Sequence, residues 1–247
     1  MKRIKFLQDN LPGRHAPLAA VENLRARNTL SLRSILESRQ ADAEWSQAEK
    51  LITRYQISDG TGGVNPGDRR AIYYLISALK PSSVLEVGTH IGASTIHIAA
   101  ALHDSQIGRG GHARLLSVDI RNVNCDKTRL WEKFGTKQSP YAMIRESGFG
   151  RLVRFVTSTS VDFAAYCRER FDFIFLDGDH AEKTVLTEPP AVLPLLNPDG
   201  VILLHDFFPN RVPRWSDGSV IAGPCEAIKK LRSEAYALVA LPLGGLQ

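Results

Sequence analysis

The stretch "VLEVGTHIGAST", residues 84–95, passes from an apolar run through two glycines into a helix-forming segment. Gly88 and Gly92 stand where the chain must turn, and glycine lets a backbone turn sharply and approach a ligand closely. Their Gly-x-x-x-Gly spacing differs from the Gly-x-Gly-x-x-Gly of a dinucleotide site, which disfavours a nicotinamide dehydrogenase. The stretch predicts a strand, a turn and a helix, and either a structural turn or a ligand loop explains the glycines.

Segments of the same two kinds alternate along the rest of the chain. Short apolar runs predict buried strands, and the runs between them predict helices. Because strands that alternate with helices form parallel sheets covered on both faces, we predict an α/β fold with a doubly wound, mostly parallel sheet. The expected strands cover residues 83–87, 114–119, 151–156, 171–176, 200–204 and 236–243, and the expected helices cover residues 68–80, 93–102, 160–170, 181–196 and 223–235.

A further helix is expected before this alternating unit. Residues 41–56 place Trp45, Leu51 and Tyr55 on one helical stripe. The segment 58–68 that follows is rich in Gly, Asn and Pro, which is typical of a loop. An apolar stripe needs a covering surface, so we expect the helical segment to act as a lid or as a contact between copies of the chain.

We divide the 247 residues into a helical N-terminal extension, residues 1–65, and a main domain, residues 66–247. Residues 1–39 hold eight basic and three acidic side chains, whereas the charges of the remainder balance. Such a basic arm is either a solvated helix face or a contact to nucleic acid or an anionic membrane surface.

The composition is that of a globular protein, with 43% hydrophobic and 23% charged residues. No apolar run reaches the length of a membrane span, and no sustained apolar segment near the start indicates a secretory signal. The three cysteines lie far apart without a Cys-x-x-Cys pair, which favours free thiols in a reducing compartment. We expect a cytoplasmic protein with no membrane partner.

Polar side chains gather where three expected strands end. Asp119 closes the second strand, where a carboxylate can accept hydrogen bonds from ribose hydroxyls or can cap a helix. "FDFIFLDGDH" (171–180) and "GVILLHDF" (200–207) end in acids and imidazoles, and converging carboxylates repel one another unless a cation or a proton compensates. They favour a bound divalent cation, and the alternative is that Asp177 contacts a cofactor alone while the others cap helices and loops.

These motifs resemble a known family. Glu86-Val-Gly-Thr-His-Ile-Gly-Ala-Ser94 is similar to the E-x-G-x-x-x-G-x-S motif of class I S-adenosylmethionine-dependent methyltransferases, closest to the catechol and caffeoyl-CoA O-methyltransferase type. "FIFLDGDH" followed by "NPDGVILLHDF" resembles the macrocin-type O-methyltransferases of antibiotic sugars. The resemblance covers roughly residues 68–240 and implies a Rossmann-like methyltransferase fold.

The resemblance also implies roles for individual residues. His180 falls on the position of a general base. The implied metal ligands, for Mg²⁺, Mn²⁺ or a similar ion, are Asp177, His205 and Asp206. The implied contacts to S-adenosylmethionine, with Glu86 supporting the loop, are Glu86, Gly88, Thr89, Gly92, Ser94, Asp119, Ser160 and Asp177.

Two positions depart from the family. The sugar-modifying relatives carry an acidic residue where this chain has His205. Imidazole suits Mn²⁺, Fe²⁺ or Zn²⁺ better than Mg²⁺, so the metal preference has shifted, or His205 lies behind the ligands, or no metal binds. After "YALVALPLGGLQ" (236–247) there is little room for the family's final antiparallel strand.

We therefore predict a metal-assisted O-methyltransferase that acts on a hydroxyl of a small molecule such as a sugar, a phenol or a natural product. Residues 207–219, with Arg211 and Arg214, could close over the acceptor. One alternative is a non-catalytic nucleotide-binding or scaffold protein of the same fold. A nucleic-acid methyltransferase is disfavoured, because "DGDH" stands where the amino-directed enzymes carry Asn/Asp-Pro-Pro and an aromatic residue.

Overall fold

The computed structural model describes residues 32–57, 63–106, 112–208, 218 and 220–233. The strands are β1 (Ser83–Val87), β2 (Arg114–Asp119), β3 (Val153–Thr157), β4 (Phe171–Leu176) and β5 (Leu196–Leu204). The helices are α2 (Leu32–Leu36), α3 (Arg39–Ile52), η1 (Thr53–Tyr55), α4 (Pro66–Leu79), α5 (Ala93–Gln106), α6 (Leu130–Lys133), α7 (Pro140–Glu146), α8 (Ser160–Tyr166), α9 (Glu182–Val192), η3 (Leu193–Leu195) and α10 (Gly223–Ser233).

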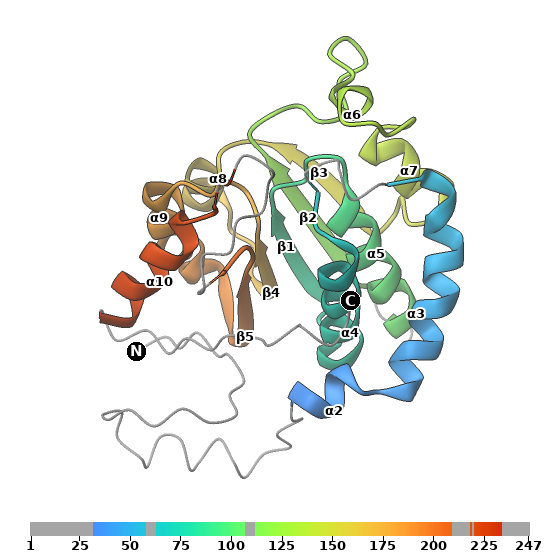
Figure 1. The fold of residues 1–247 in the computed structure, drawn as a ribbon, viewed down its shortest axis with the longest axis horizontal. Helices are drawn as coiled ribbons and strands as arrows, with labels where there is room; N and C mark the ends of the chain where they lie inside the picture. Colours follow the sequence, from blue (N-terminus) through green and yellow to red (C-terminus); the bar gives the residue numbers. More distant parts are fainter. Residues whose placement is uncertain (1–31, 58–62, 107–111, 209–217, 219, 234–247) are drawn as a thin grey trace.

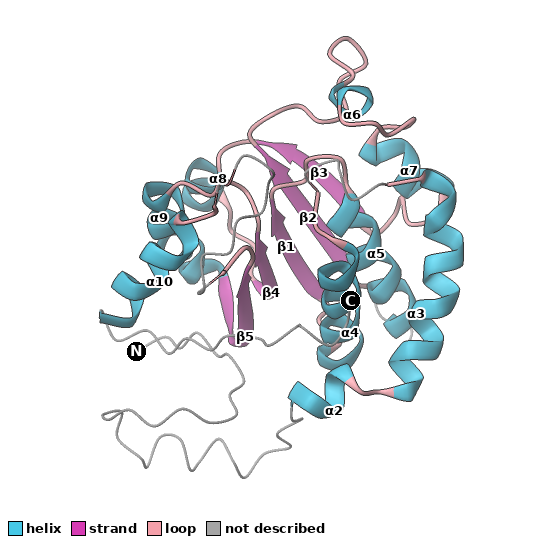
Figure 2. Cartoon of the chain, in the orientation of Figure 1, coloured by secondary structure: helices cyan, strands magenta, loops and turns pink. Residues whose placement is uncertain are grey.

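The strands form one parallel sheet in the order β3-β2-β1-β4-β5. Helices α8, α9 and α10 lie on one side of it, and α3, α4, α5 and α7 lie on the other (Figures 1 and 2). This confirms the predicted doubly wound α/β fold. The strand order reverses between β1 and β4, and ligands of such sheets bind at the carboxyl ends of the strands near that reversal.

Local sequence explains why the central elements start and stop where they do. All five residues of β1 are buried, as its apolar pattern predicts. Helix α4 begins after Asn65, whose side chain caps the first turn, and Pro66 occupies the first helical position. It ends at Lys80, whose left-handed backbone (φ 50°) and the following Pro81 stop the helix.

The N-terminal helix α3 packs against α4 and α5 (Figure 1). Its buried Trp45 stacks on the ring of His97 at 5.2 Å and meets Tyr73 edge-on at 5.4 Å. The apolar stripe of residues 41–56 is therefore covered within the chain. The division at residue 65 and a role as lid or oligomer contact stay predictions, and residues 58–62 of the expected loop lie outside the described residues.

Some elements differ from the expected ranges. The short helices α2, α6 and α7 were not predicted, because they hold too few turns for a periodic pattern. Helix α9 continues through Pro189 and Pro190, held by packing against α8 and α10. The expected strand at 236–243 lies outside the described residues. Within the described part of the chain, no helix has the length and apolarity that a membrane crossing requires.

Candidate active site

The candidate site lies along the carboxyl edge of the sheet. Residues just beyond the strand ends extend the interstrand hydrogen bonding by one step, so their side chains meet at one edge. The backbone N–H groups concerned donate to the neighbouring strand at 2.8 Å (Gly88 to Val118), 2.9 Å (Asp177 to Val87) and 3.1 Å (His205 to Leu176).

The glycine turn after β1 touches the end of β4. Gly88 has φ 98°, and a Cβ atom there would lie 2.1 Å from the carbonyl oxygen of Asp177. Gly92 has φ 80°, and its Cβ would lie 2.9 Å from the Pro140 side chain. Both positions therefore require glycine for the close packing of this chain on itself, and that packing sets the turn directly beside Asp177.

Glu86 lies fully buried beneath this turn. Its carboxylate accepts hydrogen bonds from Ser94 (2.6 Å), Thr95 (2.6 Å) and Ser117 (2.5 Å), and Thr89 bonds Ser117 at 2.6 Å. Burial raises the pKa of Glu86 to about 7, although the three hydroxyl groups oppose the rise. These contacts join β1, β2 and the start of α5 under the glycine turn. Thr95 and Ser117 were missed, although hydroxyls inside apolar segments are a signal for such a cluster.

Asp119 ends β2 and is 5% exposed. One carboxylate oxygen accepts from the backbone N–H of His90 (2.9 Å), and the other accepts from the backbone N–H of Arg121 (2.9 Å). The Arg121 guanidinium adds an ion pair at 3.2 Å. The guanidinium contacts both oxygens, at 3.2 and 3.4 Å, so the two backbone N–H groups and Arg121 together fill the roughly four acceptor positions of this carboxylate. A ligand hydroxyl would have to take the place of the exposed guanidinium.

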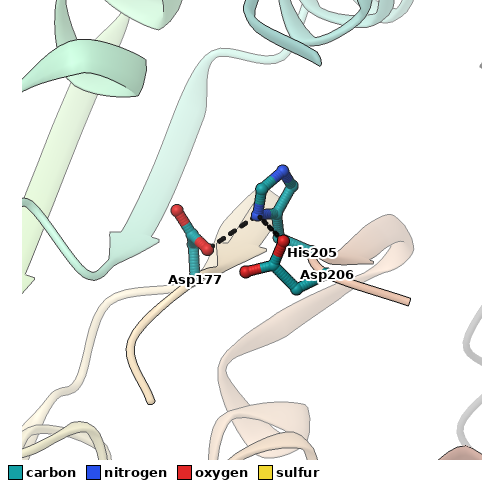
Figure 3. A group of neighbouring side chains, drawn as sticks. All are labelled: Asp177, His205 and Asp206. Carbon is teal, nitrogen blue, oxygen red and sulfur yellow. Dashed lines mark hydrogen bonds and ion pairs between the residues drawn. The ribbon is translucent and has the colours of Figure 1, made fainter. Parts of the chain in front are cut away.

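Asp177, His205 and Asp206 gather at the ends of β4 and β5 (Figure 3). Nδ1 of His205 lies 2.8 Å from a carboxylate oxygen of Asp177 and 3.3 Å from one of Asp206. One ligand atom from each residue lies within 4.8 Å of the others. Asp206 adopts φ 59°, a left-handed backbone that aspartate tolerates better than most residues. Two carboxylates with one imidazole suit a divalent cation of the first transition row.

The opposite nitrogen of His205 is also bonded. Nε2 lies 3.0 Å from a carboxylate oxygen of Asp68, in the first turn of α4. Burial tends to lower the pKa of His205, but the charge of Asp177 and the carboxylate hydrogen bonds outweigh burial and raise it well above its usual value. In the absence of a metal ion, a protonated ring therefore compensates these carboxylates. Sequence reasoning missed Asp68, which reads there as an ordinary helix start.

His180 and Asp179 point to different partners. Nε2 of His180, which is 46% exposed, lies 3.3 Å from a carboxylate oxygen of Asp206. Asp179 instead accepts from the Ala181 backbone (3.2 Å) and from the Thr184 hydroxyl (2.6 Å), so it supports the start of α9. The Thr184 bond holds the pKa of Asp179 below its usual value. His180 thus lies beside the cluster, and Asp179 supports the start of α9 instead.

Ser160 begins α8 after β3, the strand next to β2. Its hydroxyl donates to the buried Glu188 of α9 at 2.8 Å. Burial raises the pKa of Glu188 to about 6, and the charges of Asp179 and Asp177 add to the rise. Glu188 lines a small hollow that Asp177 and His180 also line. Glu188 was missed, and its position directly before two prolines of an apolar helix was the available signal.

Comparison with known proteins agrees with this geometry. Residues 85–207 match the family model of a methyltransferase domain, and the match runs from β1 to the cluster beyond β5. The chain carries a class I, S-adenosylmethionine-dependent methyltransferase domain. The expectation from the glycine motif and the acidic strand ends is thereby confirmed for this domain.

Solved structures share the fold of this methyltransferase at low sequence identity. The methyltransferase PaMTH1 of Podospora anserina, bound to S-adenosylhomocysteine, has TM-score 0.53 and 16% identity, over 92% of this chain and 89% of its own. An O-methyltransferase from Bacillus cereus has TM-score 0.50 and 19% identity, over 87% and 84%. TomG from Streptomyces achromogenes has TM-score 0.51 and 17% identity, over 87% and 83%. No curated protein sequence matches the chain.

The methyltransferase fold brings together most residues that the sequence singled out. Gly88, Asp119 and Asp177 share the carboxyl edge with His180, His205 and Asp206. The side chains of Glu86 and Ser94 lie buried beneath the turn and support it from below. Thr89 is buried within the turn itself. Of the expected loop at 207–219, residues 209–217 and 219 lie outside the described part of the methyltransferase.

Proposed function

We propose that the protein is an O-methyltransferase that acts on a hydroxyl group of a small molecule, assisted by a divalent cation, with His180 as the general base. The acceptor class is a sugar, a phenol or a natural product. One observation carries the proposal: the cluster of Asp177, His205 and Asp206 lies beside the glycine turn, with His180 at its exposed rim.

The glycine turn and Asp119 support cofactor binding at this edge. S-adenosylmethionine supplies a methyl group on a sulfonium, which must be aligned with the acceptor oxygen. Gly88 and Gly92 leave both ends of the turn without a side chain. The hydroxyls of Ser94 and Thr95 donate to Glu86 and support the turn from below. Asp119 would offer the ribose the acceptor positions that the exposed Arg121 guanidinium occupies, and Ser160 begins α8 after the adjacent strand.

The cluster supports activation of the acceptor. Asp177, His205 and Asp206 would hold the ion, and a bound divalent cation lowers the pKa of a hydroxyl group that it contacts. His180 lies across from Asp206 and is the exposed imidazole at the rim, where it can take up the proton of the acceptor. The Asp206 carboxylate orients the ring and stabilises the charge that it gains.

The names of two neighbours in fold agree with an oxygen acceptor. The Bacillus cereus protein is an O-methyltransferase, and TomG is an O-methyltransferase involved in tomaymycin synthesis. At this level of identity their acceptors do not transfer to this chain. They make hydroxylated natural products a sensible first set of compounds to test.

The test is release of S-adenosylhomocysteine, which every methyl transfer from S-adenosylmethionine produces. Purified protein is incubated with S-adenosylmethionine and with hydroxylated sugars, phenols and natural products, and both products are measured by mass spectrometry. We expect release with at least one class, loss after exhaustive chelation, and recovery with Mn²⁺ at least as well as with Mg²⁺. Asp177→Asn and Asp206→Asn should not recover.

The same experiment contains the outcomes that contradict the proposal. Undiminished release after chelation would remove the cation from the reaction while leaving the O-methyltransferase in place. Cofactor binding without release for any compound would favour a non-catalytic nucleotide-binding protein. Methylation of nucleic acid in a parallel incubation would replace the small-molecule acceptor.

A further inference from the structure

Asp68 lies outside the residues so far given a chemical role, at the start of α4. Its backbone N–H donates to Oδ1 of Asn65 at 3.0 Å, and the Asn65 side-chain amide donates back to the Asp68 carboxylate. This reciprocal pair caps the helix, and an acid in the first turn is favoured by the helix dipole. The carboxylate is therefore fixed in place by its own helix.

The fixed carboxylate reaches across to the end of β5. Its Oδ2 atom lies 3.0 Å from Nε2 of His205, 137 residues away in the chain. The side chains of Asp68 and His205 are 16% and 13% exposed, so the bond is largely shielded from water. The other ring nitrogen, Nδ1, faces Asp177 and Asp206. Helix capping alone does not require the contact to His205.

We propose that Asp68 is a positioning residue that orients His205 for metal binding by accepting its Nε2–H. The bond to Asp68 leaves Nδ1 as the ligand atom, directed between Asp177 and Asp206. Histidine ligands generally donate their second ring N–H to a carboxylate or carbonyl, which sets the tautomer and the ring orientation and raises the basicity of the ligand nitrogen. The inference rests on the metal site of the proposed function.

The arrangement also ties a segment outside the matched methyltransferase region to the site. Asp68 precedes residues 85–207, and α4 packs on α5 and α3. The same helix that covers one face of the sheet therefore holds one side of the His205 ring. An ionised carboxylate in place of His205 would have no proton to donate to Asp68. The role of Asp68 therefore depends on the imidazole at position 205.

The test is calorimetric titration of MnCl₂ into the full-length protein and the variant Asp68→Asn. Loss of a carboxylate behind a ligand typically weakens metal binding about 10–100-fold, and that is the expected change in Kd. Asp162→Asn is the matched control, because Asp162 forms the same reciprocal cap with Thr159 on α8, at 3.0 and 2.7 Å. It should bind Mn²⁺ like the parent. Thermal unfolding without metal checks that each variant is folded.

Two further readouts separate positioning from a structural effect. Asp68→Glu keeps a carboxylate and should recover part of the lost affinity. ¹⁵N NMR of the histidine rings, with Zn²⁺ as a diamagnetic ion, should show His205 protonated at Nε2 and shifted at Nδ1. In Asp68→Asn this tautomer should no longer be uniquely populated.

The outcomes distinguish this inference from the proposed function. If the parent binds Mn²⁺ and Asp68→Asn binds it within twofold, Asp68 only caps α4 and the inference is wrong while the metal site stands. If the parent binds no divalent ion yet releases S-adenosylhomocysteine, the metal site and this inference both fall and the methyltransferase remains.

Discussion

At the carboxyl end of β2, the Asp119 carboxylate accepts hydrogen bonds from the backbone N–H groups of His90 and Arg121. It thus connects the glycine turn with the loop after β2. Its other two contacts come from the exposed Arg121 guanidinium, which the ribose hydroxyls of the proposed cofactor would replace. Substitution should therefore affect cofactor affinity in two ways, through the lost bonds and through a looser turn.

Asp119→Ala should weaken binding of S-adenosylhomocysteine at least tenfold in calorimetry. A hydrogen bond to a charged acceptor is worth about 1.5–3 kcal/mol, and two are expected from the ribose. Asp119→Asn, which keeps one carbonyl acceptor, should lie between Ala and the parent. Parent-like affinity in the Ala variant would show that the ribose binds elsewhere.

His180→Gln should lower turnover by about 10²–10⁴-fold, the usual contribution of a general base. The affinity for S-adenosylhomocysteine should stay within twofold, because His180 contacts Asp206 at the rim and not the glycine turn. The exposed His112, at the amino end of β2, supplies the control His112→Gln with parent-like turnover. If both variants turn over alike, another group takes up the proton.

At the scale of elements, α3, α4 and α5 share one core, and His97 of α5 lies in it. The ring is 4% exposed, stacks on Trp45 and bonds the carbonyl of Ala93 at 2.6 Å. Burial lowers the pKa of His97 to about 4, although the Ala93 bond opposes the change. The packed helices therefore hold a neutral imidazole between them.

This packing predicts a pH-dependent stability. An unfolded chain protonates His97 below about pH 6.5, whereas the folded chain takes the proton only near pH 4. The contribution of His97 to the free energy of unfolding is complete above pH 6.5. It falls by about 3 kcal/mol as the pH falls toward 4. Urea unfolding should show that the parent loses about that much more stability than His97→Phe over this range.

The comparison with the variant is needed because Glu86 acts in the opposite sense. Burial raises the pKa of Glu86 to about 7. Its contribution to the free energy of unfolding is therefore complete in acid and is lost as the pH rises through 7. The two effects oppose each other between about pH 4.5 and 6.5 in the parent. Equal pH dependence in parent and His97→Phe would mean that His97 is protonated in the folded protein.

At the scale of the whole molecule, the open question is whether residues 1–65 and 66–247 unfold independently. Trp45 is 6% exposed between α4 and α5, and Tyr55 donates to the Met143 carbonyl of α7 at 3.1 Å. Contacts of this kind couple the N-terminal helices to the sheet domain. We therefore expect one cooperative transition for the described chain.

Trp45→Ala should lower the free energy of unfolding by about 3–5 kcal/mol, because it leaves a cavity between three helices. Within each protein, circular dichroism and intrinsic fluorescence should report one and the same urea midpoint, and that midpoint should be lower in the variant. The exposed Tyr166 of α8 supplies the control Tyr166→Ala, with a change within about 0.5 kcal/mol. A separate early transition of the N-terminal helices would indicate that residues 1–65 form an independent unit.

The alternation of strands and helices and the polar residue types at the strand ends could be predicted from the amino-acid sequence. The bounds of β1 and β4 agree with the apolar runs at 83–87 and 171–176, because burial of a central strand is written into consecutive residues. The glycine motif and the acidic strand ends could be predicted from the sequence for the same reason. Each lies within a few residues of the element that presents it.

Which of these residues lie together depends on the order of the strands and on the packing of the helices. The order β3-β2-β1-β4-β5 sets Asp119, Gly88, Asp177 and His205 along one edge. Contacts between distant segments carry no local pattern, so the pairs Asp68–His205 and Ser160–Glu188 could not be predicted. The directions of two neighbouring side chains also differ: Asp179 bonds Thr184 at the start of α9, whereas His180 faces Asp206. Two consecutive residues lie at the same place in the fold, but the packing around them determines the direction in which each side chain points.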